Sequence, residues 1–270
     1  MSRLSRSLLL FVAILVLSGC HPAKTKGLLS TLMNPDHLRV GIAVDSPPLA
    51  YKQDDVITGL EARFAAGLAT FAGRKLKLVE LPREELAKAL LEGKVDIVMA
   101  GMTVAEVQKQ QLAATNPYLI SGQVALVHLD DFKQLGTGPA NLSGKNVRLG
   151  VVGDSSGENL IRGLNPKGTT NRFASAPEAV QALIADTIDA FIFDLPANFY
   201  YASLYVDKGL TPGATPMTRE PLVWAVLPDD VDMRKTANTY LAEIEKSGAL
   251  RIIIERSIPF YHNTAYSPKL

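Results

Sequence analysis

A repeated alternation of strand and helix patterns constrains the fold of this 270-residue chain more than any other feature. Short apolar or β-branched runs at 40–44, 76–81 and 95–100 have the character of buried strands. Between them, apolar residues recur at helical spacing over 60–71 and 86–91. Strands that alternate with helices in this way predict an α/β fold with mainly parallel strands.

The second half of the chain repeats this pattern. The segment Arg39–Ser46 lines up with Arg148–Ser155, and Ala89–Val98 lines up with Ala182–Phe191. In both copies a helix leads into a strand through an aspartate. Any two α/β units share some of this likeness, but the ordered match favours two similar lobes.

Two parallel-sheet lobes predict where a ligand would bind. In open α/β sheets the ligand site lies beyond the carboxyl ends of the strands. Those ends carry small and polar residues, at Asp45–Ser46, Ala100–Thr103, Asp154–Ser156 and Asp194. If the lobes face each other, these residues line one cleft, which is the usual place for a small-molecule site.

Composition excludes several other classes of function. The 28 basic and 27 acidic side chains give a net charge of +1, so there is no basic surface of the kind that nucleic-acid binding requires. One cysteine cannot form an internal disulfide or a metal cluster. The four histidines have no metal-ligand spacing. We therefore expect no metal and no cofactor.

The amino terminus has the pattern of an export signal. Arg3 and Arg6 precede an apolar run, Leu8–Leu17, that is too short to span a bilayer. Leu17-Ser18-Gly19-Cys20 then resembles the lipobox of bacterial lipoproteins. That resemblance implies a signal peptide over 1–19, a lipid anchor on Cys20 and a tether over 20–36, on an exported protein. The alternative is a buried cysteine after a failed signal.

The resemblance also bears on which membrane holds the anchor. His21 follows Cys20, where many Gram-negative lipoproteins that stay in the inner membrane have aspartate. We therefore expect the outer membrane, with the folded part in the periplasm or at the cell exterior.

The folded part carries an ordered set of short segments: Leu38–Gly41, Pro47-Pro48, Gly59–Glu61, Leu90–Asp96, Ala100–Thr103, Pro117-Tyr118, Leu142–Val147 and Asp189–Asp194. With this set, about residues 37–256 resemble the family-3 extracellular solute-binding proteins, the polar amino-acid type. The resemblance implies the type II periplasmic-binding-protein fold, with two lobes that close on a ligand.

That fold implies a division of the chain into lobes. We expect lobe 1 to comprise 37–124 and 196–258, lobe 2 to comprise 125–195, and a tail to follow over 259–270. The implied function is non-enzymatic capture of a small polar solute, an amino acid or a derivative, by a monomer. Such proteins deliver their solute to an ABC-type permease.

Several ligand-contacting positions match the family, and others depart from it. By resemblance, Asp194 would pair with a ligand ammonium group, with Thr103, Ala100 and Gly101 beside it. The family's carboxylate-binding arginine falls on Gln108, which carries no charge. Its Gly-Ser/Thr-Thr segment becomes Asp154-Ser155-Ser156, which adds an acid where an anion would bind.

Two aromatic positions of the family are also changed. They fall on Leu49 and Arg83, and Arg83 could supply a positive charge from another wall. With Asp45, Ser46, Ser155 and Ser156, these residues complete the expected ligand site.

Other functions fit parts of the sequence. The runner-up is a sensor or regulatory module, since related domains regulate murein transglycosylases. Gly153–Gly157 fits the Gly-x-Ser-x-Gly pattern of serine hydrolases, with Ser155 as nucleophile and His262 later in the chain. A few members of the resembled fold are dehydratases, for which Glu220 or Asp194 could serve as the acid.

Overall fold

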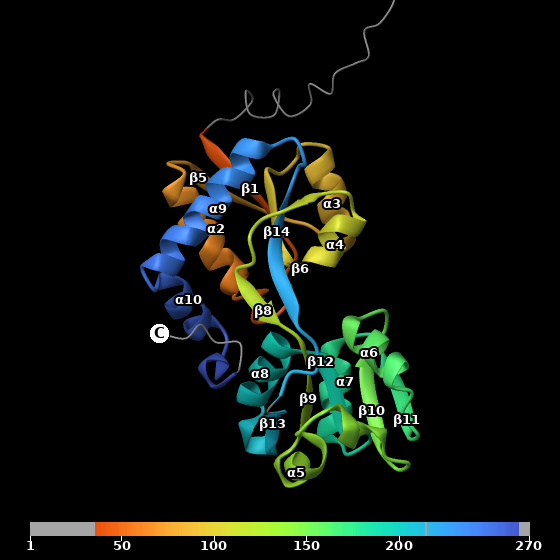
Figure 1. Ribbon diagram of the computed structural model, residues 1–270. Coiled ribbons are helices and arrows are strands. Elements are labelled where there is room, and N and C mark those ends of the chain that lie inside the picture. The colour runs from red at the N-terminus through yellow and green to blue at the C-terminus, as the bar shows by residue number, and fades with distance from the viewer. Residues whose placement is uncertain (1–35, 214, 265–270) are drawn as a thin grey trace, which may run out of the picture.

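A computed structural model describes residues 36–213 and 215–264, so the predicted signal peptide, Cys20 and most of the tether lie outside the described residues. Figure 1 shows two lobes, each built on its own sheet with helices on both faces, which confirms the predicted α/β class. No helix within the described ranges is long and apolar enough to cross a membrane.

The first sheet has the order β5-β1-β6-β14-β7, and β8 also pairs with β14. Its strands are β1 (His37–Ile42), β5 (Lys75–Glu80), β6 (Ile97–Thr103), β7 (Ala113–Ala114), β8 (Leu119–Ser121) and β14 (Glu220–Val226). Strands β5, β1 and β6 are parallel, and β14 is antiparallel to β6. A small antiparallel sheet adjoins this lobe, formed by β2 (Asp45–Ser46), β3 (Ala50–Gln53) and β4 (Val56–Thr58).

Helices cover both faces of the first sheet. They are α2 (Leu60–Phe71), α3 (Arg83–Leu91), α4 (Val104–Lys109), α9 (Val231–Lys246) and α10 (Ala249–Ser257). Alternate residues of β6 enter different cores: Ile97 and Met99 pack with α2 and α9, while Val98 and Ala100 pack with α3. This division follows from the two-residue period of a strand that is buried on both faces.

The second sheet repeats the arrangement in the order β11-β10-β12-β9-β13. Its strands are β9 (Gln123–His128), β10 (Arg148–Val152), β11 (Thr169–Phe173), β12 (Ala190–Asp194) and β13 (Leu210–Pro212). Its α-helices are α5 (Phe132–Leu135), α6 (Ser156–Leu164), α7 (Ala176–Ile184) and α8 (Leu195–Leu204). Short 3₁₀ turns lie at η1 (Leu129–Asp131), η2 (Pro139–Ser143), η3 (Val206–Lys208) and η4 (Tyr261–Asn263).

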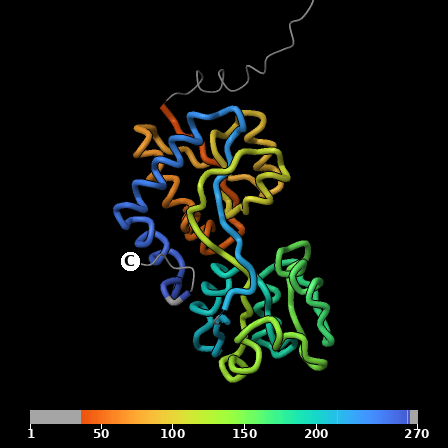
Figure 2. Tube along the Cα trace, in the orientation of Figure 1, coloured from red at the N-terminus to blue at the C-terminus, as the bar shows by residue number. Residues whose placement is uncertain are grey.

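Two strand connections join the lobes, and they lie side by side in Figure 2. The first runs from β8 into β9, and the second runs from β13 into β14. Within them, Met217 donates from its backbone N–H to the Gln123 carbonyl at 2.8 Å, and the Gln123 N–H donates to Thr218 Oγ1 at 2.8 Å. The two connections are therefore hydrogen-bonded to each other at the hinge.

The return to the first lobe comes later than the predicted residue 196. Strand β13 pairs antiparallel with β9, and Ala197, Tyr201 and Ala202 of α8 share a core with Leu126. The chain re-enters the first sheet only at β14, which begins at Glu220. The prediction was wrong because β13 is three residues long and has no distinct sequence pattern.

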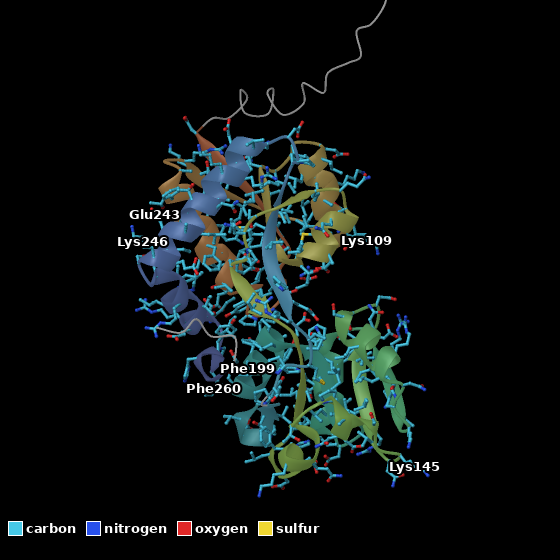
Figure 3. The ribbon with its side chains drawn as sticks, viewed as in Figure 1. Lys109, Lys145, Phe199, Glu243, Lys246 and Phe260 are labelled. Carbon is cyan, nitrogen blue, oxygen red and sulfur yellow. The ribbon has the colours of Figure 1, made fainter. Side chains whose placement is uncertain are left out.

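The predicted tail also contributes to the core. Tyr261 is buried beside Ile258, and its hydroxyl donates to the Ile120 carbonyl at 2.9 Å. Phe199 of α8 belongs to the same apolar cluster, although α8 lies in the second lobe. Figure 3 shows Phe199 on the side of α8 that faces the chain near Phe260. The end of the chain thus helps to hold the two lobes together.

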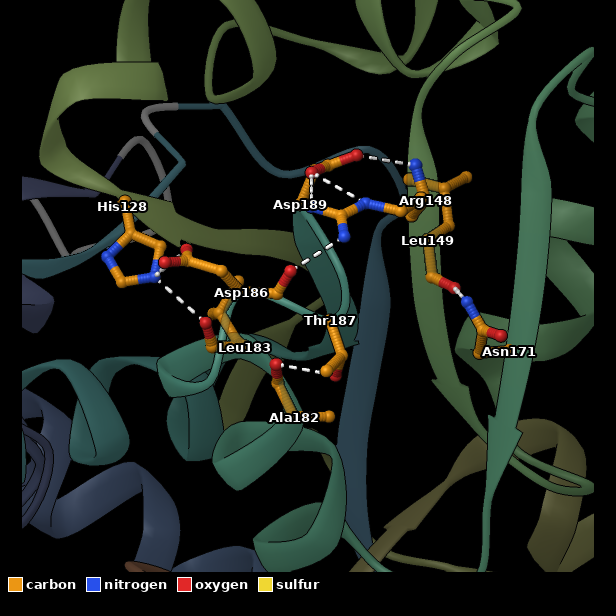
Figure 4. Close-up of polar contacts among 9 residues, drawn as sticks. All are labelled: His128, Arg148, Leu149, Asn171, Ala182, Leu183, Asp186, Thr187 and Asp189. Carbon is orange, nitrogen blue, oxygen red and sulfur yellow. Dashed lines mark hydrogen bonds and ion pairs between the residues drawn. The ribbon is translucent and has the colours of Figure 1, made fainter.

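The repeat in the sequence corresponds to an arginine–aspartate contact that occurs once in each lobe. Arg39 lies in β1, and its N–H donates to Asp96 Oδ2 at 2.8 Å while its guanidinium binds Asp96 and the Gly93 carbonyl. In the second lobe, the Arg148 N–H donates to Asp189 Oδ2 at 2.7 Å, and its guanidinium binds Asp189 and the Asp186 carbonyl (Figure 4). Each aspartate ties a helix-to-strand turn to a neighbouring parallel strand, β1 in the first lobe and β10 in the second.

We expect the two contacts to differ in strength, because they differ in burial. The Asp96 and Arg39 side chains are 11% and 16% exposed, against 24% and 44% for Asp189 and Arg148. Asp96→Ala should cost about 3 kcal/mol of unfolding free energy, since it leaves two shielded arginines, Arg39 and Arg74, without their acid. Asp189→Ala should cost about 1 kcal/mol. Urea titration of both variants measures the difference, and an equal or larger cost at Asp189 would contradict this account.

Candidate functional site

The strand ends that the sequence predicts to line a ligand cleft lie, in both lobes, on the side towards the hinge (Figure 1). In the first lobe these are β2, the end of β6 and the start of α3. In the second lobe they are the start of α6 and the end of β12. A pocket in the first-lobe wall is lined by Arg83, Glu84, Leu86, Met102, Glu106 and Gln110. Among the described residues, no group of acidic, histidine or cysteine side chains could hold a metal ion.

Arg83 is held against the first-lobe wall. One guanidinium nitrogen, Nη1, donates to the Ala100 carbonyl at 2.9 Å, and Nη2 donates to Ser46 Oγ at 2.8 Å. Asp45 Oδ1 lies 3.6 Å from Nη2. The structure therefore brings together Asp45, Ser46, Arg83 and Ala100, four residues of the ligand site expected from the sequence.

A fully buried carboxylate supports this wall from behind. Glu61 accepts from the Gly101 N–H at 2.8 Å, from Trp224 Nε1 at 3.0 Å and from the Tyr118 hydroxyl. Burial raises the pKa of Glu61, and its three hydrogen bonds oppose that rise. The contact fixes Gly101, whose φ of +62° suits glycine and which lies directly under Leu49.

Thr103 ends β6 and begins α4. Its N–H and its hydroxyl donate to Glu106 Oε2 at 2.6 and 2.8 Å, and its Oγ1 accepts from the Glu106 N–H at 3.2 Å. This reciprocal capping box places the exposed Glu106 carboxylate at the cleft wall. Gln108, two residues further on, is exposed on the same short helix.

Asp194 faces the cleft from the second lobe. It stands at the position before α8 where a side chain could cap the helix, yet it makes no capping hydrogen bond. Instead, its Oδ1 accepts from Gln123 Nε2 at 2.6 Å. Burial raises the pKa of Asp194 to about 6, with Gln123 and Arg83 opposing the rise and with Glu220 and Glu106 adding to it.

Gln123 connects Asp194 to a second hinge carboxylate. Its Nε2 lies 3.3 and 3.4 Å from the Glu220 oxygens, and Thr218 Oγ1 donates to Glu220 Oε1 at 2.7 Å. Gln123 is fully buried, and its Oε1 has no hydrogen-bond partner. Sequence reasoning did not select Gln123 or Glu106, because only the fold brings the hinge and the helix cap to one cleft.

The serines of the second lobe hold the start of α6. Ser155 Oγ accepts from the Glu158 N–H at 3.2 Å and donates to the Val152 carbonyl at 2.7 Å. The Asp154 N–H donates to Glu158 Oε2 at 2.7 Å. Ser155 thus caps a helix, Ser156 is exposed beside it, and the serine-hydrolase alternative gains no support here.

Comparison with known proteins settles the family. The model of bacterial extracellular solute-binding proteins, family 3, matches residues 38–259. The chain belongs to this family. It is 28% identical to the L-cystine-binding protein TcyJ of Escherichia coli (strain K12) over 233 residues, which is 86% of each chain.

Solved structures agree in fold. An ancestral cationic amino-acid solute-binding protein superposes with a TM-score of 0.78 at 28% identity, covering 86% of this chain and 99% of that one. A binding component of an ABC transporter from Wolinella succinogenes, complexed with lysine, gives 0.75 at 28% identity over 84% and 97%. The fold is thus the type II periplasmic-binding-protein fold, in a family of extracytoplasmic solute-binding proteins.

Glu61 offers a test of how the cleft wall is held. Glu61→Ala would leave the Gly101 N–H, the Tyr118 hydroxyl and Trp224 Nε1 without their acceptor, at a cost of about 3–5 kcal/mol. Glu61→Gln keeps an acceptor oxygen for Gly101 and Tyr118 but leaves Trp224 Nε1 facing an NH2 group, so it should cost less, about 1–3 kcal/mol. Trp224 is the single tryptophan, so its fluorescence during urea unfolding reports on this contact directly. Equal costs for the two variants would refute the supporting role.

Proposed function

We propose that this protein captures a small polar solute that carries an ammonium group, an amino acid or a derivative, between its two lobes. Asp194 carries the proposal. Its carboxylate is shielded in the second lobe, it caps no helix, and it faces Arg83 and Glu106 of the first lobe. An ammonium group would stabilise its ionised form by direct charge pairing.

The remaining site residues have roles consistent with this proposal. Asp45, Ser46 and Arg83 form one wall, and Ala100, Gly101 and Thr103 form the strand end next to it. Ser155 and Ser156 lie at the opposing helix start. Leu49 lies over Gly101 within the core, and Gln108 lies on the exposed face of α4.

We further propose that the protein is a lipoprotein that acts in uptake as a monomer. The lipobox-like segment ending at Cys20 supports anchoring, and residues 20–36 would tether the lobes to the outer membrane. The named ABC-transporter component among the relatives supports a permease as partner.

The Asp194→Asn variant tests the ammonium site. Wild-type protein should show a higher melting temperature with at least one member of a panel of basic amino acids, cystine and simple amines, because a ligand that binds only the native state stabilises it. The variant should lose that shift. Since binding requires ionised Asp194, whose pKa is about 6, wild-type affinity should be constant above pH 7 and should fall about tenfold per pH unit below 6.

The exposed acid Asp130, in the second lobe and away from the cleft, provides the matched control. Asp130→Asn should keep both the ligand shift and its pH dependence. A ligand that binds Asp194→Asn as tightly as the wild type would refute the role of Asp194.

Cys20→Ser tests the anchor separately. In the full chain expressed with its own amino terminus, wild-type protein should sediment with membranes, and its amino-terminal peptide should carry the mass of a diacylglyceryl group. The variant should lack that mass, because a hydroxyl does not form the thioether. An unmodified, membrane-free wild-type protein would refute lipidation.

A further inference from the structure

The polar groups of the cleft favour cations on both walls. Glu220 and Glu106 raise the pKa of Asp194 and Arg83 lowers it, so two carboxylates and one guanidinium lie within electrostatic reach of this group. Asp194 and Glu220 lie on the second-lobe and hinge side, and Glu106 lies on the first-lobe side. Negative charge therefore faces the cleft from two separated places.

The guanidinium of Arg83 is already engaged by the protein. It donates to the Ala100 carbonyl and to Ser46 Oγ, and Asp45 lies 3.6 Å away and offsets its charge. A ligand carboxylate would have to compete with these acceptors for the guanidinium.

The backbone donors near the cleft are also occupied by internal carboxylates. Glu106 accepts from both the N–H and the hydroxyl of Thr103, and Glu158 accepts from the Asp154 N–H. Arg172 pairs with Asp154 and Glu158 at 2.9 Å each, so its charge is offset as well. Thr103, Asp154 and Arg172 therefore each already have a carboxylate of the protein as partner, and a ligand anion would have to compete with it.

An independent observation comes from Gln123. Its Oε1 is a buried acceptor without a partner, beside Asp194 and next to the start of α6, where a Cβ added at Gly157 would lie 3.0 Å away. A buried acceptor left unpaired costs about 1–3 kcal/mol. The amide oxygen can accept a hydrogen bond but cannot donate one, so it offers nothing to a carboxylate.

We infer that the ligand is an amine without a carboxylate, bearing two separated cationic groups. One group would lie at Asp194, Glu220 and Gln123, and the other would lie at Glu106. This inference rests on the proposed capture of an ammonium-bearing solute and narrows its class to diamines and guanidino amines.

Three matched pairs of probes test the inference, each an amino acid and the amine left when its carboxylate is removed. The pairs are lysine and cadaverine, arginine and agmatine, and ornithine and putrescine. Calorimetric titration of the exported chain at pH 7.5 should give at least tenfold tighter binding for the amine in one or more pairs. Amino acids that bind as tightly as their amines, or tighter, would overturn the inference.

Glu106→Gln provides a second arm. Glutamine preserves the capping box with Thr103, so the fold should be kept, as a melting curve will verify. Without the Glu106 carboxylate, the affinity for the amine should fall about tenfold. The ratio of amine affinity to amino-acid affinity should fall with it. Unchanged affinity and unchanged preference would overturn the place assigned to the second cation.

The binding results distinguish an error in the further inference from an error in the proposed function. If no amine binds but an amino acid binds and requires Asp194, the further inference is wrong and the proposed function stands. If neither class binds, or if binding ignores Asp194→Asn, the proposed function is wrong and the inference falls with it.

Discussion

The buried carboxylate of Glu61 is the constraint on which the cleft depends. Glu61 belongs to α2, and its three hydrogen-bond partners belong to the end of β6, the segment before β8 and strand β14. A carboxylate out of water is costly, so its position is acceptable only while all these donors are in place. The first-lobe wall and the strand that returns from the second lobe are thereby fixed to each other.

From that fixed wall, the chemistry of the cleft follows through short local contacts. Gly101 is fixed by Glu61, Ala100 next to it binds Arg83, and Thr103 two residues on holds Glu106. Strand β6, which is seven residues long, thus positions Gly101 itself, the Arg83 guanidinium and the Glu106 carboxylate at its carboxyl end. On the opposite side, Gln123 fixes Asp194 from the hinge strand itself, so the carboxylate moves with the hinge.

Much of this was predictable from the sequence, and the rest depended on long-range pairing. The Arg39–Asp96 and Arg148–Asp189 contacts lie at the positions where the two halves of the chain line up. Asp45, Ser46 and Ala100 were predicted near one another because strand ends converge, whereas Arg83 was added through the family resemblance. The return to the first lobe was predicted too early because β13, which keeps the chain in the second lobe, is only three residues long and has no recognisable strand pattern. Gln123 and Glu106 carried no motif, since their roles depend on which strands and helices meet.

Charge on the two walls explains how such a cleft could couple binding to closure. Asp194 and Glu106 are like charges on different lobes, so their mutual repulsion opposes approach of the lobes. A cation between them replaces that repulsion with two attractions, and each attraction strengthens as water leaves the cleft. A ligand shifts the equilibrium only by its difference in affinity for the open and closed states. A solute that reaches both carboxylates gains that difference from closure itself, whereas one that touches a single wall binds both states equally and leaves the hinge where it was.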